Sequence, residues 1–232
     1  MLKNKLPYFL PLANPSLENA KYFPSLDKKI INILRGDKYI LGKEVSLFQK
    51  NFAKYCNSKF CLGTSTGTDS ILLALKALNI SQDDKVITIP NAGYYSTLSI
   101  KALRAKPIYV DIDPNSMTMS NTSVKEIIEE NNIKCIVVTH LFGLLANIDP
   151  ILKLASKHNI PIIEDCAQAH GAKFRGKVAG TFGDIGTYSF YPTKNLGAIG
   201  DAGALITNKK NIYEALIKLY QYGWSDKYYV DL

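Results

Sequence analysis

Lys194 is the residue of this 232-residue chain whose setting points most directly to covalent chemistry. It lies in the run SFYPTKN (189–195), in a loop rich in small residues between two apolar segments. A lysine that is partly withdrawn from water has a lowered pKa, and its neutral amine can attack a carbonyl to form a Schiff base. The alternative is an ordinary exposed lysine, and the packed surroundings of this loop argue against it.

A second candidate for chemistry is the acidic pair at the end of the apolar run in PIIEDCAQAHG (161–171). We expect Glu164 and Asp165 to place at least one carboxylate where a strand ends. Such a carboxylate can pair with a cationic ring nitrogen and keep that ring protonated. A helix cap or a structural ion pair is the competing interpretation.

A third candidate is GTSTGTDSILLALKAL (63–78), in which a glycine- and threonine-rich turn opens into a helix. The free N–H groups and the positive dipole end of a helix start make a phosphate site. The turn is neither a Walker A loop nor GxGxxG, so nucleotide-binding motifs are not supported. The alternative is a simple cap in which Thr66 or Thr68 satisfies backbone donors.

The elements that must position these residues alternate between short β-branched runs and amphipathic segments, which predicts an α/β domain with a mostly parallel seven-stranded sheet between helices. Ligands bind such sheets at the carboxyl ends of the strands, where the three candidates and also Tyr94, Gln168 and Ser189 fall. The expected strands are 60–64, 86–90, 108–111, 135–140, 161–164, 187–190 and 204–207, and the expected helices are 68–78, 95–103, 123–131 and 149–158.

Composition narrows the classes of protein that this chain can be. It is 47% hydrophobic and 21% charged, as is usual for a globular protein, and no run is long enough to span a membrane. The net charge of +8 comes mainly from scattered lysines, without an arginine cluster, so we expect no nucleic-acid partner. The four cysteines and three histidines lack metal-ligand spacing, which predicts no metal site and reduced cysteines in a cytoplasmic protein.

Together the three segments resemble the DegT/DnrJ/EryC1/StrS family of pyridoxal-phosphate (PLP)-dependent sugar aminotransferases, within the fold-type-I superfamily. SFYPTKNLGAIGDAGALITN is similar to the family's cofactor-lysine signature, EDCAQAHGAKFRGKVAGTFGD to its ring-binding segment, and GTSTGTDSILLAL to its phosphate turn. The resemblance extends from about residue 34 to 229. It implies a fold-type-I large domain over 34–232, preceded by an arm and first helix over 1–33.

The resemblance implies roles for three residues around the cofactor ring. Lys194 would form the Schiff base with PLP and later move protons as a general acid and base. Asp165 would hold the pyridine nitrogen, and Gln168 would lie near the 3-oxygen of the ring.

It also implies residues for the rest of the cofactor. Gly67, Thr68 and Ser189 would bind the phosphate, and Tyr94 would stack on the face of the ring. Three positions depart from the family's pattern, since it favours threonine at Gly93, glycine at Ala202 and arginine at Tyr220. Of these, Gly93 and Tyr220 could alter the pocket.

The reaction that the resemblance implies is a ping-pong transamination. An amino acid, usually glutamate, would donate the amino group, and a keto-sugar on a nucleotide diphosphate would accept it. Family members that dehydrate carry histidine in place of the lysine, so Lys194 disfavours dehydration. We also expect a homodimer, and we expect the family's smaller C-terminal domain to be largely absent from this chain.

Two alternatives stay open at this point. The chain could be another fold-type-I PLP enzyme, such as an amino-acid transaminase or a cysteine desulfurase-like protein, although the SFYPTKNLGA context favours a sugar aminotransferase. It could also be a catalytically impaired fragment that acts as a binding or interaction module. Nucleic-acid binding, suggested only by the pI near 9.1, is a distant third.

Overall fold

The computed structural model describes residues 11, 13–226 and 229–230, so most of the start of the predicted N-terminal arm lies outside the described residues. The chain forms two compact units, residues 1–43 and 44–232. The boundary expected between residues 33 and 34 falls inside the first unit, near the end of its helix α2.

The first unit contains α1 (Pro15–Asn19), the 3-10 helix η1 (Ala20–Tyr22) and α2 (Phe23–Leu34). Asn14 caps α1 by accepting a hydrogen bond from the Leu17 N–H at 3.1 Å. Pro24 stands in the first turn of α2, where the N–H that proline lacks would have no helical partner. Local sequence therefore accounts for where these helices begin.

The second unit contains all the segments that carry candidate site residues. Each of the seven strands and four helices expected here is present, with its ends within two residues of the expected positions. The helices are α3 (Lys43–Cys56), α4 (Gly67–Ala77), α5 (Tyr95–Ala102), α6 (Asn121–Glu130), η2 (Leu141–Gly143), α7 (Ile148–Lys157) and α8 (Lys210–Tyr220). The strands are β1 (Phe60–Thr64), β2 (Lys85–Thr88), β3 (Lys106–Tyr109), β4 (Ile133–Thr139), β5 (Ile162–Asp165), β6 (Lys173–Phe174), β7 (Lys177–Val178), β8 (Ile185–Ser189), β9 (Gly203–Thr207), β10 (Trp224–Asp226) and β11 (Tyr229–Val230).

Seven of these strands form one sheet in the order β1-β9-β8-β5-β4-β2-β3, which confirms the mostly parallel seven-stranded sheet. Strands β8, β5, β4, β2 and β3 are parallel to one another, whereas β9 is antiparallel to both β1 and β8. The segment between β8 and β9 contains no helix that could cross the sheet, so the chain turns back on itself and β9 runs antiparallel. β6 with β7 and β10 with β11 form separate two-stranded sheets.

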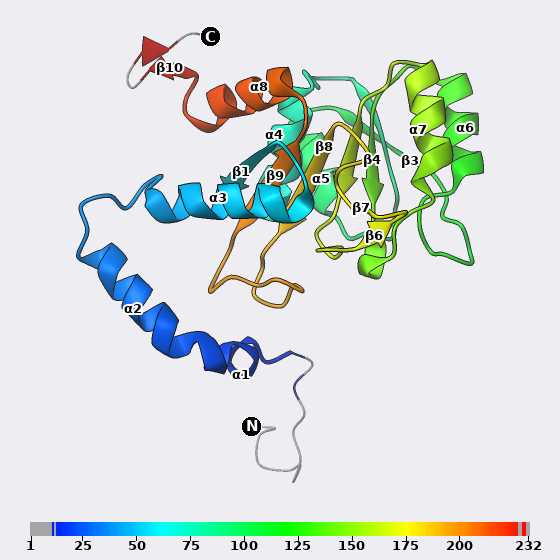
Figure 1. Cartoon of the computed structure of the whole chain (residues 1–232). Coiled ribbons are helices and arrows are strands. Elements are labelled where there is room, and N and C mark those ends of the chain that lie inside the picture. Colours follow the sequence, from blue (N-terminus) through cyan, green and yellow to red (C-terminus); the bar gives the residue numbers. More distant parts are fainter. Residues whose placement is uncertain (1–10, 12, 227–228, 231–232) are drawn as a thin grey trace, which may run out of the picture. The chain divides into compact units, whose positions relative to one another are not determined.

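Helices cover both faces of the sheet, as Figure 1 shows. One face packs against α4, α5 and α8 through a cluster that includes Ile71, Ile100 and Leu216. The other packs against α6 and α7 at one end and α3 at the other, through two further clusters. The side chains of β5 alternate between them, with Ile163 toward α4 and Ile162 toward α7. Burial on both faces explains the near-continuous apolar runs of central strands such as β2 and β4.

The parallel strands share one carboxyl edge, and the loops leaving β2, β4, β5 and β8 therefore emerge together. The loop from β8 carries Lys194, and the loop from β1 leads into the start of α4. No helix among the residues described is both long and apolar enough to cross a membrane.

Candidate active site

A cavity of about 470 Å³ lies where the loop after β8 meets the start of α4 and the end of β5. It gathers side chains from the three segments that sequence analysis singled out, although these segments are far apart along the chain. Its lining is Thr66, Gly67, Thr68, Ile71, Tyr95, Asp165, Ala167, Ser189, Tyr191, Thr193, Lys194, Asp201 and Ala202.

The start of α4 forms one wall of this cavity. Thr66 is the N-cap, and its Oγ1 accepts a hydrogen bond from the Asp69 N–H at 3.0 Å, so the capping alternative is confirmed for Thr66. Gly67 and Thr68 are the first two residues of the helix, so their N–H groups have no acceptor within it. A helix start with donors and a dipole facing the cavity suits an anion such as a phosphate.

Gly67 brings this helix start against Ser189 at the end of β8. A Cβ added at Gly67 would lie 2.6 Å from the Ser189 Cβ, closer than two such carbon atoms can approach. Only glycine therefore allows the helix start and the Ser189 hydroxyl to meet at one point. The structure thus brings Gly67, Thr68 and Ser189 together, as the sequence analysis expected of a phosphate site.

Asp165 lies at the end of β5 and is only 5% exposed. Its Oδ1 accepts a hydrogen bond from the Ala167 N–H at 3.1 Å. Burial raises the pKa of this carboxyl, and the Ala167 N–H, His140 and Lys194 oppose the rise. A buried carboxylate that lines a cavity and has one hydrogen-bond donor at 3.1 Å is suited to a cationic ligand.

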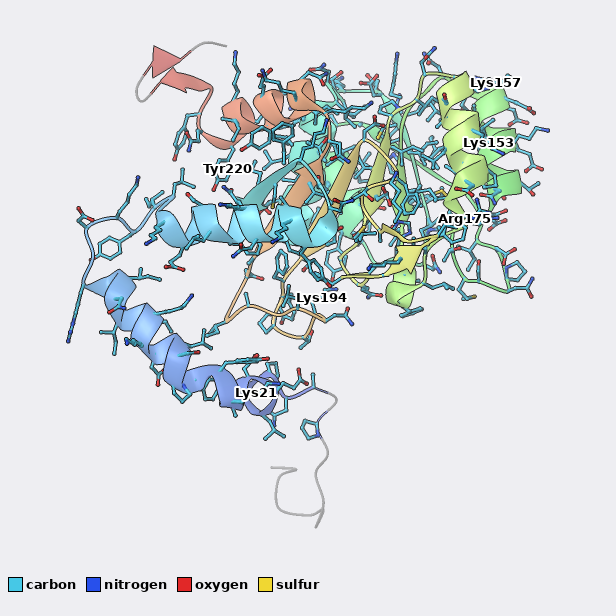
Figure 2. The ribbon with its side chains drawn as sticks, in the orientation of Figure 1. Lys21, Lys153, Lys157, Arg175, Lys194 and Tyr220 are labelled. Carbon is cyan, nitrogen blue, oxygen red and sulfur yellow. The ribbon has the colours of Figure 1, made fainter. Side chains whose placement is uncertain are left out.

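Lys194 lies in the loop that leaves β8, where Figure 2 shows it well separated from Lys153 and Lys157 of α7. The Lys194 N–H bonds the Tyr191 carbonyl at 2.8 Å, and this turn holds the residue half-buried at the cavity. Gly197 closes the loop, since a Cβ there would lie 2.4 Å from the Pro192 carbonyl oxygen. The turn and the glycine place Lys194 in the lining of the cavity that Asp165 also lines.

Two of the expected site residues lie outside the cavity lining. Tyr94 is the N-cap residue of α5 and is 57% exposed, while its neighbour Tyr95 lines the cavity. The Gln168 Oε1 accepts a hydrogen bond from the Phe142 N–H at 2.8 Å, in the loop after β4. The stacking role of Tyr94 and the ring contact of Gln168 therefore stay predictions.

The departure at Gly93 has a local physical explanation. Its φ is +71°, a left-handed conformation that threonine rarely adopts, and an added Cβ would lie 3.0 Å from the Tyr95 ring. Glycine at this position therefore leaves room for the Tyr95 ring, and Tyr95 lines the cavity. Ala202 also lines the cavity, and Tyr220, on α8, does not.

Several lining residues were missed from the sequence. Tyr95, Tyr191, Thr193 and Asp201 carry no motif signal beyond their closeness to Tyr94 and Lys194. The pair Tyr94–Tyr95 indicated an aromatic residue at this loop, but which of the two lines the cavity depends on how α5 packs. That packing is a property of the tertiary structure.

The profile of the DegT/DnrJ/EryC1/StrS aminotransferase family matches residues 24–232, which is most of the chain. The chain belongs to this family. The resemblance drawn from the three motifs is therefore confirmed, and residues of all three motifs line the same cavity.

Curated relatives of this DegT/DnrJ/EryC1/StrS family member include nucleotide-sugar transaminases. It is 40% identical over 210 residues to a dTDP-3-amino-3,6-dideoxy-alpha-D-galactopyranose transaminase of Aneurinibacillus thermoaerophilus, covering 90% of this chain and 58% of that protein. It is 38% identical over 191 residues to a dTDP-3-amino-3,4,6-trideoxy-alpha-D-glucose transaminase of Micromonospora megalomicea subsp. nigra. This match covers 82% of this chain and 51% of that protein. The family member thus spans between half and three fifths of these relatives.

Solved structures share its fold. The DesV protein of S. venezuelae, solved with a ketimine intermediate, superposes with a TM-score of 0.91 and 32% identity over 96% of this chain and 60% of that one. The ntda protein of Bacillus subtilis, solved with bound cofactor PMP, superposes with a TM-score of 0.89 and 27% identity. The match covers 99% of this chain and 52% of that one. The fold-type-I architecture of this family member is therefore confirmed.

Proposed function

We propose that this chain carries the cofactor site of a PLP-dependent aminotransferase that moves an amino group from an amino acid to a keto-sugar on a nucleotide diphosphate. The observation that carries the proposal is the single cavity lined by Lys194, Asp165, Ser189 and the start of α4. The family and the transaminases among its relatives support it.

The residues at the cavity fit PLP group by group. The packing of Gly67 on Ser189 brings a hydroxyl to a helix start, which suits the phosphate. Asp165 is a buried carboxylate whose charge would be stabilised by a protonated ring nitrogen. Lys194 would supply the amine for the covalent link to the cofactor aldehyde.

When bound, PLP supplies an electron sink for the carbanion that forms at the substrate's α-carbon. Lys194 would act as the general acid and base that carries the proton away from that carbon, a role that needs its Nζ at the cavity. Asp165 holds the positive charge of the ring nitrogen in place. The start of α4 and Ser189 fix the phosphate, so that the ring cannot shift while the proton moves.

The amino donor in this proposal is glutamate and the acceptor is a keto group of a nucleotide-linked deoxysugar. The acceptor class is supported by the dTDP-sugar transaminases among the relatives. Lysine at position 194 supports transamination, since the dehydrating members that the sequence analysis considered have histidine there.

The proposal is tested by following PLP-loaded protein in the visible range while L-glutamate is added. We expect the cofactor band to convert to the pyridoxamine form with release of 2-oxoglutarate, and a dTDP-linked keto-deoxysugar to restore it. D-glutamate serves as the control that should do neither. Binding of PLP without any conversion would instead favour the impaired binding module, and conversion by other amino acids alone would favour another fold-type-I enzyme.

Substitution of Ser189 tests the phosphate assignment separately. Ser189→Ala removes one hydrogen bond to a charged group, and we expect PLP affinity to fall about 10- to 100-fold. Binding of pyridoxal, which lacks the phosphate, should change little. The matched control is Ser156→Ala, an exposed serine on α7, which should leave both affinities unchanged. Equal losses for PLP and pyridoxal would contradict the assignment.

We also propose that the protein is a homodimer with the cavity near its interface. Within the second unit, most of the large exposed apolar residues lie in the segments that emerge at the carboxyl edge, and a surface of this kind favours a protein partner. They are Tyr94, Tyr95, Leu98, Phe142, Leu144, Tyr191, Leu196 and Ile199. Sedimentation should give twice the chain mass of 25.7 kDa, and a single-chain mass across micromolar concentrations would contradict the proposal.

A cytoplasmic location belongs to the same proposal. It is supported by the four cysteines, which are all buried free thiols, as is usual in a reducing compartment. Fractionation of cells that produce the protein would test it, and recovery from a secreted or membrane fraction would contradict it.

A further inference from the structure

A buried cluster of His140, Glu164 and Cys166 lies beneath the candidate active site. Their potential ligand atoms all fall within 4.8 Å of one another, and the His140 and Glu164 side chains have no exposed surface. Residues of these types also form metal sites, so the hydrogen bonds decide what the cluster is for.

All the accepting capacity of the Glu164 carboxylate is used by the protein itself. Its Oε1 accepts the N–H groups of Phe182 and Gly183 at 2.7 and 2.6 Å. Its Oε2 accepts the Gly180 N–H at 2.8 Å and pairs with the His140 Nε2 at 2.9 Å. Four donors around one carboxyl group leave no position for a metal ion, and they satisfy a polar group that would otherwise be costly to bury.

The ring of His140 is equally occupied. Its Nδ1 accepts the Ala146 N–H at 3.1 Å, so the ring proton must lie on Nε2 and be donated to Glu164. One imidazole therefore connects the carboxylate to the loop that follows β4. Within the cluster, His140 and Glu164 thus form a hydrogen-bonded pair in which His140 is the donor.

This pair lies on the opposite face of the sheet from the cavity. Glu164 and Asp165 are consecutive in β5, so their side chains point to opposite faces, and Asp165 points into the cavity. Glu164 is thus directly behind the residue proposed to hold the ring nitrogen. The same carboxylate anchors the turn 180–183 that leads into β8.

Two further contacts connect the pair to the cavity residues. The His140 backbone N–H bonds the Asp165 carbonyl at 3.0 Å, which joins the ends of β4 and β5. Two residues further on, the Phe142 N–H bonds the Gln168 Oε1 at 2.8 Å, while Phe142 itself has a φ of +55°. A backbone in this unusual conformation persists only when neighbouring contacts hold it. His140, the first residue of this loop, supplies such contacts through its bonds to Glu164 and Asp165.

We propose that Glu164 and His140 are positioning residues, a buried pair that fixes Asp165 and the Gln168 contact from behind the sheet and so keeps the cofactor ring protonated. This inference rests on the proposed function, because it assigns Asp165 to a ring nitrogen. It predicts that loss of the bond between the pair changes the cofactor's protonation as well as the stability of the fold.

Two substitutions at one position separate the two hydrogen bonds of His140. In His140→Gln the side-chain amide can still donate to Glu164 from the place of Nε2, while the acceptor for Ala146 is lost. In His140→Asn the shorter side chain can accept from Ala146 in place of Nδ1, but it cannot reach Glu164. The two variants lose one buried hydrogen bond each and should be destabilised to a similar extent.

The measurements are PLP affinity and a pH titration of the visible band of the bound cofactor. A protonated ring nitrogen repels the proton on the nearby Lys194 linkage, so its loss raises the titration midpoint. We expect His140→Asn to weaken PLP binding at least about tenfold and to raise the midpoint by about one unit, and His140→Gln to stay near the parent. Equal behaviour of the two variants would overturn the inference.

Asp165→Asn is measured beside them to distinguish the two levels of the argument. If Asp165→Asn leaves affinity and midpoint unchanged, the proposed function itself is wrong. If Asp165→Asn shifts both and His140→Asn shifts neither, only the positioning role is wrong.

A measurement on the parent protein covers the case in which the His140 variants do not fold. In nitrogen-15 spectra, PLP should shift the His140 ring resonances with the same saturation curve as the visible band. The Nε2-protonated form should persist throughout, because Ala146 continues to occupy Nδ1. Ring resonances that do not respond to PLP would overturn the inference.

Discussion

Lys194→Ala is expected to abolish the visible absorption band that PLP forms with the parent protein. The band requires a covalent link from the Lys194 amine, which lies half-buried beside the cavity that Asp165 and Ser189 also line. Transfer of the amino group should fall by at least about 10²- to 10⁴-fold, the usual contribution of a positioned general acid and base. Visible spectra with and without glutamate measure both effects.

The control for this substitution is Lys153→Ala on α7, which Figure 2 shows far from Lys194 within the same unit. It removes one lysine from the same charge excess but should leave the band and its response to glutamate unchanged. A band of parental intensity in Lys194→Ala would show that the cofactor is held by another amine, and the assignment of the active site would be wrong.

Asp165→Asn is expected to have the second largest effect on activity. A carboxylate beside a cationic nitrogen raises the pKa of that nitrogen by about 1–3 units, and each unit is worth about 1.4 kcal/mol. Loss of the charge should therefore slow conversion by glutamate about 10- to 10³-fold, with PLP still attached to Lys194. Single-turnover kinetics with glutamate would measure this loss, and an unchanged rate would contradict the role of Asp165.

The same substitution should stabilise the protein when no cofactor is bound. Burial raises the native pKa of Asp165 above its unfolded value of about 3.9. As pH rises from about 4 through the native pKa, the native state must accept a buried charge, and the free energy of unfolding falls. Asparagine avoids that loss, so urea unfolding at neutral pH should show a gain that vanishes below the unfolded pKa.

Asp113→Asn is the matched control for this stability effect. Its change in the free energy of unfolding at neutral pH should have the opposite sign. The Ser116 N–H is the main cause that lowers the pKa of this half-buried residue's carboxyl. Its contribution is present above the unfolded pKa and is lost as pH falls, so Asp113→Asn should destabilise at neutral pH. If Asp165→Asn also destabilised the cofactor-free protein at neutral pH, Asp165 would be part of the structural framework alone.

Much of this architecture could be predicted from the sequence because its signals are local. The apolar runs and helical periodicity predicted the strands and helices within two residues of their ends. The change from a glycine- and threonine-rich turn to a helix singled out Gly67 and Thr68, and the carboxylate at the end of the fifth apolar run singled out Asp165, and all three line the cavity. Lys194 was identified because a lysine is unusual in a loop of small residues between buried strands.

Other features depend on contacts between distant segments, and only the tertiary structure decided them. The strand order, with β9 antiparallel between β1 and β8, follows from which pairings bury both faces of the sheet. Tyr95, and not Tyr94, lines the cavity, and that depends on how α5 packs against the rest of the chain. The bond between His140 and Glu164 joins residues 24 positions apart. No local pattern marks it, because a buried polar group is tolerated only when donors from several segments converge on it.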